Sequence, residues 1–294
     1  MKWFFFILLP LLSAFKVTAQ GYFSKGRIKT TADSIKFNGF MFMYSAIALI
    51  LFTVRQLPST QTIIYALIVS VVTICFQCFY VFAFKSGAVS LSTTIVNFGM
   101  VIPILFSILF QNEKINAFKI IGFILFVVAI LLLPSKDKAE KGQKGIKTTK
   151  KWFVFIIIAT LCSGATGVFQ NIFAKSSVAD EAEVFTALIY VFASILCFAI
   201  LPLFKSKSQE PLYKSDFKIN LGLILIGLAL GLGNLCAVLA QIIIPATEYF
   251  PTTSGLQILT AVIVTSITFK ETPSVKQFIG ILLTILAIVV INLR

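Results

Sequence analysis

The chain has 294 residues, of which 58% are hydrophobic and 12% charged, and its mean hydropathy is +0.98. Soluble globular proteins are about 45–50% apolar and about 25% charged, so this composition excludes a water-facing surface. The absence of histidine excludes His-ligated metals, Ser-His triads and imidazole proton relays. The composition therefore predicts an all-α integral membrane protein whose main partner is the lipid bilayer.

Long stretches without charge divide the chain into predicted transmembrane helices, each of which needs about 20 mostly apolar residues. All 11 acidic residues fall between these stretches, as expected if a mid-membrane carboxylate costs about 2.5–3.5 kcal/mol. We therefore predict ten transmembrane helices. In chain order the stretches are 3–24 (broken only by Lys16), 37–54, 56–84, 86–112, 120–135, 152–174, 184–204, 219–247, 249–269 and 277–293.

Two polar segments separate groups of helices. Residues 135–151 are rich in Lys and Gly, lack apolar periodicity and are typical of a solvated linker. This linker divides the chain into residues 1–134 and residues 152–294, each with five predicted helices. A second short linker, residues 205–218, carries four lysines.

The two halves resemble each other in sequence. A shift of 150 residues aligns 11–25 with 161–175, and five of the fifteen pairs are identical. A shift of 158 aligns 113–132 with 271–290. Because five helices is an odd number, the second half enters the membrane in the opposite sense, so we expect two inverted repeats with one site between them. The polar identities are Ser13/Ser163, Gln20/Gln170, Lys25/Lys175 and Glu113/Glu271, and a glycine pair is Gly122/Gly280.

The first segment allows two interpretations. The apolar start followed by small residues before Gln20 is typical of a cleavable signal peptide. Residues 11–25 are nevertheless repeated as 161–175, so we expect a retained first helix that corresponds to the sixth. Intact-mass measurement separates the two, since cleavage leaves a mature chain that begins at Gln20.

Pro103 and Glu113 stand ten residues apart in VIPILFSILFQNEK, at the end of the fourth predicted helix. With the helix number and the repeat, this spacing resembles the ten-helix EamA-type branch of the drug/metabolite transporter superfamily. The second half keeps Glu271 in TFKETPS but has Ala261 at the proline position. The resemblance implies ten helices around a central cavity and the export or exchange of small metabolites, such as amino acids, sugars or nucleotide derivatives.

Lys16 is the one charged residue inside a predicted helix. It precedes Ser24 by eight residues, which places it about 12–14 Å deep at ~1.5 Å rise per residue. One interpretation is a cavity lysine that binds an anionic group of the substrate. The alternative is structural pairing or a side chain that reaches back to the interface. Thr166 is the corresponding residue of the second half, so the charge is not repeated.

Amide side chains at membrane depth form the rest of the predicted substrate site. Amides both donate and accept hydrogen bonds, which suits polar uncharged or zwitterionic solutes. The alternative is hydrogen bonding between helices, worth about 0.6 kcal/mol each. As a set we expect them to line the pathway. The predicted residues are Gln20, Gln77, Asn97, Gln170, Asn171, Asn234 and Gln257, with Gln20 corresponding to Gln170 and Gln77 comparable to Asn234.

Glu248 is the acidic residue closest to lying within the membrane, since predicted spans flank it on both sides. A proton-coupled transporter needs a buried carboxylate, which makes Glu248 the coupling candidate. The alternative is an ordinary acid at a helix N-terminus. Glu113 and Glu271 are expected to mark helix ends.

Small residues predict close helix packing, and Gly227 with Gly231 forms a G-x-x-x-G. The five cysteines all fall in apolar spans and are expected to be small buried hydrophobes. We expect no metal and no cofactor. We also expect no enzyme, since the sequence has no nucleophile–base pair, acidic metal cluster or phosphate-binding Gly-rich loop.

The net charge of +14 is distributed unevenly among the connections. Apart from Lys16, the odd-numbered connections hold 18 Lys and Arg, whereas the even-numbered connections and termini hold 6. The positive-inside rule then places both termini outside, whereas the family resemblance suggests cytoplasmic termini. The excess thus records membrane topology, and we expect no nucleic-acid partner.

We therefore expect a secondary transporter in the cell (inner) membrane that moves a small-molecule substrate and is monomeric or loosely associated. The alternative from another class is a non-transporting membrane protein, such as a sensor or an assembly subunit. Flux in proteoliposomes separates the two.

Overall fold

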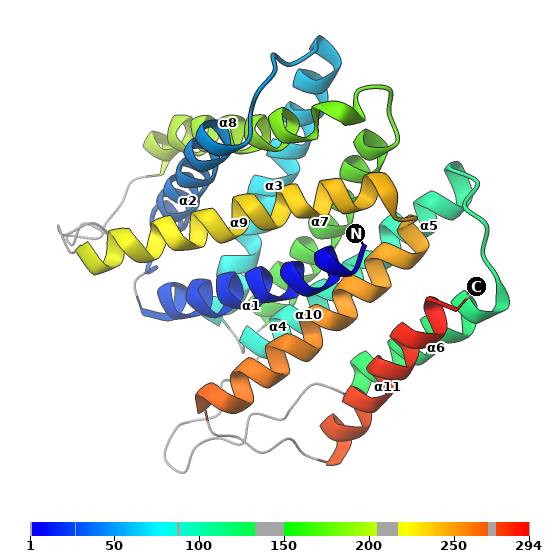
Figure 1. The fold of residues 1–294 in the computed structure, drawn as a ribbon. Helices are drawn as coiled ribbons and strands as arrows, with labels where there is room; N and C mark the ends of the chain where they lie inside the picture. Colours follow the sequence, from blue (N-terminus) through cyan, green and yellow to red (C-terminus); the bar gives the residue numbers. More distant parts are fainter. Residues whose placement is uncertain are drawn as a thin grey trace, which may run out of the picture.

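A computed structural model describes residues 2–26, 28–86, 89–132, 150–204, 217–269 and 275–293, and every regular element in these ranges is helical (Figure 1). The linkers 135–151 and 205–218 lie outside the described residues except for their last residues, and Glu271 lies outside them too. The elements are α1 Lys2–Gly26, α2 Thr31–Phe52, α3 Thr60–Ser86, α4 Val89–Asn97, η1 Phe98–Met100, α5 Val101–Phe110, α6 Ala117–Leu132, α7 Lys150–Ala174, η2 Ala179–Glu181, α8 Ala182–Ile200, η3 Leu201–Leu203, α9 Phe217–Ile243, α10 Ala246–Phe269 and α11 Val275–Ile291.

Within the described ranges, six helical segments are long and apolar enough to cross a membrane, and several shorter apolar helices accompany them. Their outer faces carry large apolar side chains such as Ile7, Leu51 and Leu161, which are more than half exposed. An apolar exterior of this extent suits lipid and not water. The predicted all-α membrane class is confirmed, while the count of ten transmembrane helices stays a prediction. The six segments are Trp3–Ser24, Thr31–Phe52, Thr60–Ser86, Lys150–Ala174, Ala179–Leu203 and Asn220–Ile243.

Helix α2 begins six residues before the predicted start at residue 37. A capping box explains the difference: Asp33 N donates to Thr30 Oγ1 at 3.1 Å, and Thr30 N donates to Asp33 Oδ2 at 2.9 Å. The Asp33 carboxylate therefore occupies the first helical turn, where it satisfies backbone donors that have no partner within the helix. Glu183 and Glu248 also lie in the first turns of their helices, α8 and α10.

The single span predicted over 86–112 is broken into α4, the 3₁₀ turn η1 and α5. Pro103 has no N–H, so the Gly99 carbonyl lacks its usual donor four residues on. Gly99 also lies against α7, since a Cβ at Gly99 would be 2.7 Å from the Thr160 carbonyl oxygen. A mid-helix 3₁₀ turn often marks a functional hinge.

The packing of helices in the first half is repeated in the second. Helix α1 packs on α9 as α7 packs on α3, and α2 packs on α9 as α8 packs on α3. Helices α2 and α8, the second of each half, contact each other, and so do α6 and α11, which lie side by side at one edge of the molecule (Figure 1). Each of these contacts keeps its counterpart when the two halves are exchanged.

Helix α9 approaches α2 closely at Gly227. Ser45 Oγ donates a hydrogen bond of 2.7 Å to the Gly227 carbonyl oxygen. A Cβ at Gly227 would lie 2.8 Å from Tyr44 Cβ and 2.9 Å from the Met41 carbonyl oxygen. The predicted role of Gly227 in close helix packing is thus confirmed. Gly233, on the same helix, has ordinary space, since its Cβ would be 3.7 Å from the nearest atom of Leu12.

We predict that Gly227→Ala destabilises the protein, whereas Gly233→Ala does not. Both changes remove the same backbone freedom in a helix, so their difference isolates the steric clash with α2, expected at about 1–3 kcal/mol. Thermal unfolding of the two purified variants in one detergent measures it. Equal melting temperatures would show that α2 moves away at no cost.

Candidate functional site

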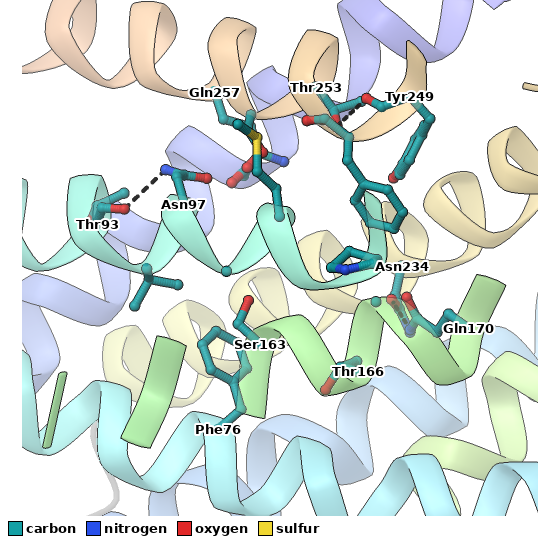
Figure 2. A pocket seen from close by; sticks show the side chains of 18 of the residues that line it. Phe76, Thr93, Asn97, Ser163, Thr166, Gln170, Asn234, Tyr249, Thr253 and Gln257 are labelled. Carbon is teal, nitrogen blue, oxygen red and sulfur yellow. Dashed lines mark hydrogen bonds between the residues drawn. The ribbon is translucent and has the colours of Figure 1, made fainter. Parts of the chain in front are cut away.

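A cavity of about 240 Å³ lies where helices of both halves meet (Figure 2). Residues of α1, α3, α4, η1, α5, α7, α9 and α10 line it. Its volume is below the range of about 300–1,000 Å³ that is typical of pockets for drug-sized ligands. The cavity therefore suits a small solute.

The two first helices of the halves contribute corresponding residues to this cavity. On α1 the lining positions are spaced i, i+3 and i+4, which places them on one helix face, and α7 repeats that face. The cavity therefore lies where the repeat relation brings equivalent surfaces together. The corresponding pairs that line it are Ser13/Ser163, Lys16/Thr166 and Val17/Gly167.

The structure brings five of the predicted substrate-site residues to the cavity and leaves the others away from its lining. Thr93 and Asn97 lie toward one end of the cavity, whereas Gln170 and Asn234 lie toward the other (Figure 2). The five that line it are Lys16, Asn97, Gln170, Asn234 and Gln257. The predicted residues outside the lining are Gln20, Gln77, Asn171 and Glu248.

The amides of the two halves form equivalent hydrogen bonds. Gln170 Nε2 donates to Asn234 Oδ1 at 2.8 Å, which joins α7 to α9 at the cavity wall. Gln20 Nε2 donates to Gln77 Oε1 at 3.2 Å, which joins α1 to α3. The second pair is fully buried against Met41, whose sulfur accepts from Gln20 Nε2 at 3.1 Å. The same bond thus faces the cavity in one half and is sealed from it in the other.

Asn171 and Glu248 have other surroundings. Asn171 is fully buried on α7, and neither polar atom of its side chain has a partner within the described part of the chain. Glu248 is partly exposed in the first turn of α10, next to the cavity residue Tyr249.

Several polar groups of the lining already form hydrogen bonds within their own helices. Thr166 Oγ1 donates to the Cys162 carbonyl, Thr253 Oγ1 to the Tyr249 carbonyl, and Asn97 Nδ2 to the Thr93 carbonyl at 2.9 Å. These local bonds fix the orientation of the side chains, but the side-chain oxygen atoms keep lone pairs that can accept further hydrogen bonds. By contrast, no hydrogen bond or ion pair within the described ranges engages Lys16 or Gln257.

Lys16 is the one charged side chain among the described residues that line the cavity. The rest of the lining is neutral and offers amides, hydroxyl groups and aromatic rings. This arrangement can hold a polar solute, and its one formal charge is positive. No cluster of three or more potential metal ligands occurs among the described residues.

Sequence reasoning left several lining residues out of the predicted site. Ser13 and Ser163 could have been predicted from the sequence, because the repeat pairs them and they share a helix face with Lys16 and Thr166. Gly99 and Met100 line the cavity only because the fourth span is broken there, which apolar composition does not show. Further lining residues outside the predicted site are Phe76, Tyr80, Thr93, Tyr249, Phe250, Thr253 and Ser254, and Gln241, another amide at membrane depth, lines the cavity as well.

Glu113 connects the two halves at one end of α10. Asn112, at φ 55°, takes the left-handed conformation that ends many helices, and it follows α5. The Glu113 carboxylate then accepts hydrogen bonds from Ala246 N at 2.8 Å and Thr247 N at 3.0 Å. Lys119 Nζ donates to Thr247 Oγ1 at 2.9 Å beside it. The expected helix-end role of Glu113 thus takes the form of a cap on a helix of the other half.

Two opposing effects act on the pKa of Glu113. Burial alone raises the pKa of this carboxyl, but the hydrogen bonds from Thr247 and Ala246 outweigh burial and leave it below the ordinary value of 4.5.

Comparison with known proteins agrees with this architecture. The model of the EamA-like transporter family matches residues 4–134 and 150–293. A solved structure titled "Crystal structure of protein" has a TM-score of 0.67 and 12% identity, over 97% of this chain and 98% of that chain. At this identity the likeness shows the fold alone. No curated protein matches the chain. The family match confirms the resemblance inferred from Pro103, Glu113 and the repeat.

We predict that Glu113→Ala lowers stability by about 0.5–2 kcal/mol near neutral pH, the usual cost of losing a helix cap. Because the folded-state pKa is depressed, the contribution is present above the unfolded-state pKa and is lost as pH falls through the folded-state value. The gap between wild type and variant should therefore close below pH 4.5. Thermal unfolding over a pH series measures it.

Asp180→Ala is the matched control, since it removes a carboxylate that is exposed in η2. It should change stability little at any pH. A gap for Glu113→Ala that stays constant down to strongly acidic pH would contradict a charged cap.

Proposed function

Because the family model matches both halves, the chain belongs to the EamA-like transporter family, and we propose that it is a secondary transporter of a small polar metabolite. In this proposal residues 1–134 and 152–294 are five-helix repeats of opposite orientation in the cell membrane, and rocking of one against the other exposes a shared site alternately to each side. The family is one of membrane transporters and not of enzymes. We expect the protein to be monomeric or loosely associated.

The observation that carries the proposal is the position of the cavity between corresponding faces of α1 and α7. Three pairs of equivalent positions line it, so the cavity lies close to the axis that relates the halves. Inverted-repeat transporters place their substrate site at such an interface, often beside discontinuous helices. The break at η1 supplies that feature, since Gly99, Met100 and Pro103 also line the cavity.

The two amide pairs support alternating access. If the two halves exchanged conformations, the Gln170–Asn234 pair would take the buried position that Gln20–Gln77 now occupies. The Gln20–Gln77 pair would then take the position at the cavity wall. In the structure the first pair faces the cavity and the second is sealed. We infer that the opposite-facing conformation seals Gln170–Asn234 and presents Gln20–Gln77 to the solute. Each pair would then contact the solute in one of the two conformations.

Flux in proteoliposomes tests transport itself. The reconstituted protein should accelerate the movement of at least one solute in a radiolabelled panel of amino acids, monosaccharides, nucleosides and small organic acids. Ser163→Phe, which fills the cavity, should abolish that flux. Leu161→Phe introduces the same ring on the same helix but at an outward-facing position, and should retain it.

Absence of accelerated flux for every solute, with a folded wild-type protein, would contradict the proposal. That outcome would favour a non-transporting sensor or assembly subunit.

Alternating use of the amide pairs predicts effects that depend on the side of the membrane. In vesicles with one protein orientation, Gln170→Met should raise the half-saturation concentration for solute added on one side, and Gln20→Met for solute added on the other. Loss of one hydrogen bond, about 1 kcal/mol, corresponds to about fivefold. Uptake kinetics measured from each side provide the readout.

Thr186→Val serves as a control, because this buried threonine of α8 bonds only its own helix among the described residues and does not line the cavity. Its kinetics should be unchanged from both sides. If both glutamine variants raise the half-saturation concentration for solute added on the same side only, the two amide pairs do not contact the solute in turn.

A further inference from the structure

Lys16 places a positive charge in the wall of a membrane-embedded cavity. Its side chain is partly exposed, and within the described part of the chain it forms no ion pair and no hydrogen bond. A lysine within a transmembrane segment is costly and normally pairs with an acid or with backbone carbonyls. The described lining holds no Asp or Glu that could pair with it. The counter-charge is therefore absent from this part of the protein.

A ligand anion is the group that supplies such a counter-charge. A hydrogen-bonded pair of a carboxylate with an ammonium group is stronger than a neutral hydrogen bond, and more so in a water-poor site. We propose that the transported solute is a small monocarboxylate whose carboxylate group binds Lys16. This inference rests on the proposed transport function and names the class of its substrate.

The charge of the lining distinguishes a monoanion from a dianion. Lys16 is the one basic residue in the described lining, so a phosphate or dicarboxylate would keep an unpaired negative charge. The N-terminus of α10 is the nearest alternative anion site, because Tyr249 and Phe250 of its first turns line the cavity. Its amide groups at Ala246 and Thr247 are already bonded to Glu113 and cannot hold a second anion.

The same argument disfavours a zwitterion. The ammonium group of an amino acid would meet no carboxylate in the described lining, and the cavity would keep a net positive charge. The remaining partners are neutral: Asn97, Gln257 and the Gln170–Asn234 pair offer donors and acceptors for hydroxyl or carbonyl groups. The cavity volume of about 240 Å³ is small for a ligand pocket, which favours a small acid.

Matched sets of solutes on one carbon skeleton test the proposal. The sets are lactate, lactamide and alanine; 3-hydroxybutyrate, 3-hydroxybutyramide and 3-aminobutyrate; and phenyllactate, its amide and phenylalanine. Binding to the purified full-length protein is measured by the rise in melting temperature with ligand concentration, since a ligand of the folded state stabilises it. Malonate and inorganic phosphate are included as dianionic probes.

We expect at least one hydroxy acid to bind about tenfold or more tightly than its amide and its amino acid. Lys16→Met should remove that preference, whereas Lys16→Arg should keep it. Lys175→Met, which removes the charge of an exposed lysine after α7, should leave binding unchanged. If Lys16→Met does not fold, the comparison of acid with amide in the wild type still decides.

Equal binding of acid and amide, tighter binding of a dianion, or an undiminished preference in Lys16→Met would overturn the proposal, as would the absence of binding by every acid. Flux separates it from the proposed function. Acids that bind but are never transported would contradict transport and leave the Lys16 site intact. Transport of neutral solutes without any acid would sustain transport and overturn the monocarboxylate.

Discussion

The structure depends on one constraint of a hydrocarbon solvent: polar groups within the membrane must find their partners inside the protein. The side chains of Gln20 and Gln77 therefore bond each other, and Ser45 bonds the Gly227 carbonyl across two helices. The outward faces are left to residues such as Leu161. Polar residues of both halves line the cavity between them, and two of these residues, Lys16 and Gln257, form no hydrogen bond within the described ranges.

The same constraint explains which parts of the molecule the sequence could predict. Scarcity of charge correctly predicted an all-helical membrane protein, and the repeat correctly paired Gln20 with Gln170. The predicted start of α2 was wrong because a charged residue was taken to mark the end of a span. In the structure, Asp33 lies within the first turn of α2 and caps the helix from there. Which of the two amide pairs faces the cavity was beyond prediction, because the sequence places both pairs at corresponding positions of the two halves.

The spacing of Pro103 and Glu113, which pointed to the family, has a physical basis in the structure. Pro103 interrupts the hydrogen bonding of its span and stands in the cavity wall. Glu113, at the far end of the same segment, binds the first backbone amides of α10. The short rigid helix α5 thus joins the cavity wall to a helix of the other half. A displacement of α10 relative to α5 must break this cap or move the cavity wall with it.

In the proposed mechanism, the asymmetry between Lys16 and Thr166 would give the bound solute a preferred orientation. Two identical repeats would offer a solute two equivalent half-sites and no preferred orientation. A positive charge on α1 alone would hold an anionic group on the side of the first half. The neutral part of the solute would then lie against amides that differ between conformations, Gln170–Asn234 in the one observed and Gln20–Gln77 in its counterpart. The charge of Lys16 would thereby orient the solute, while the hydrogen bonds of the amide pairs would distinguish the two conformations. The orientation of the solute and alternating access would then depend on different residues.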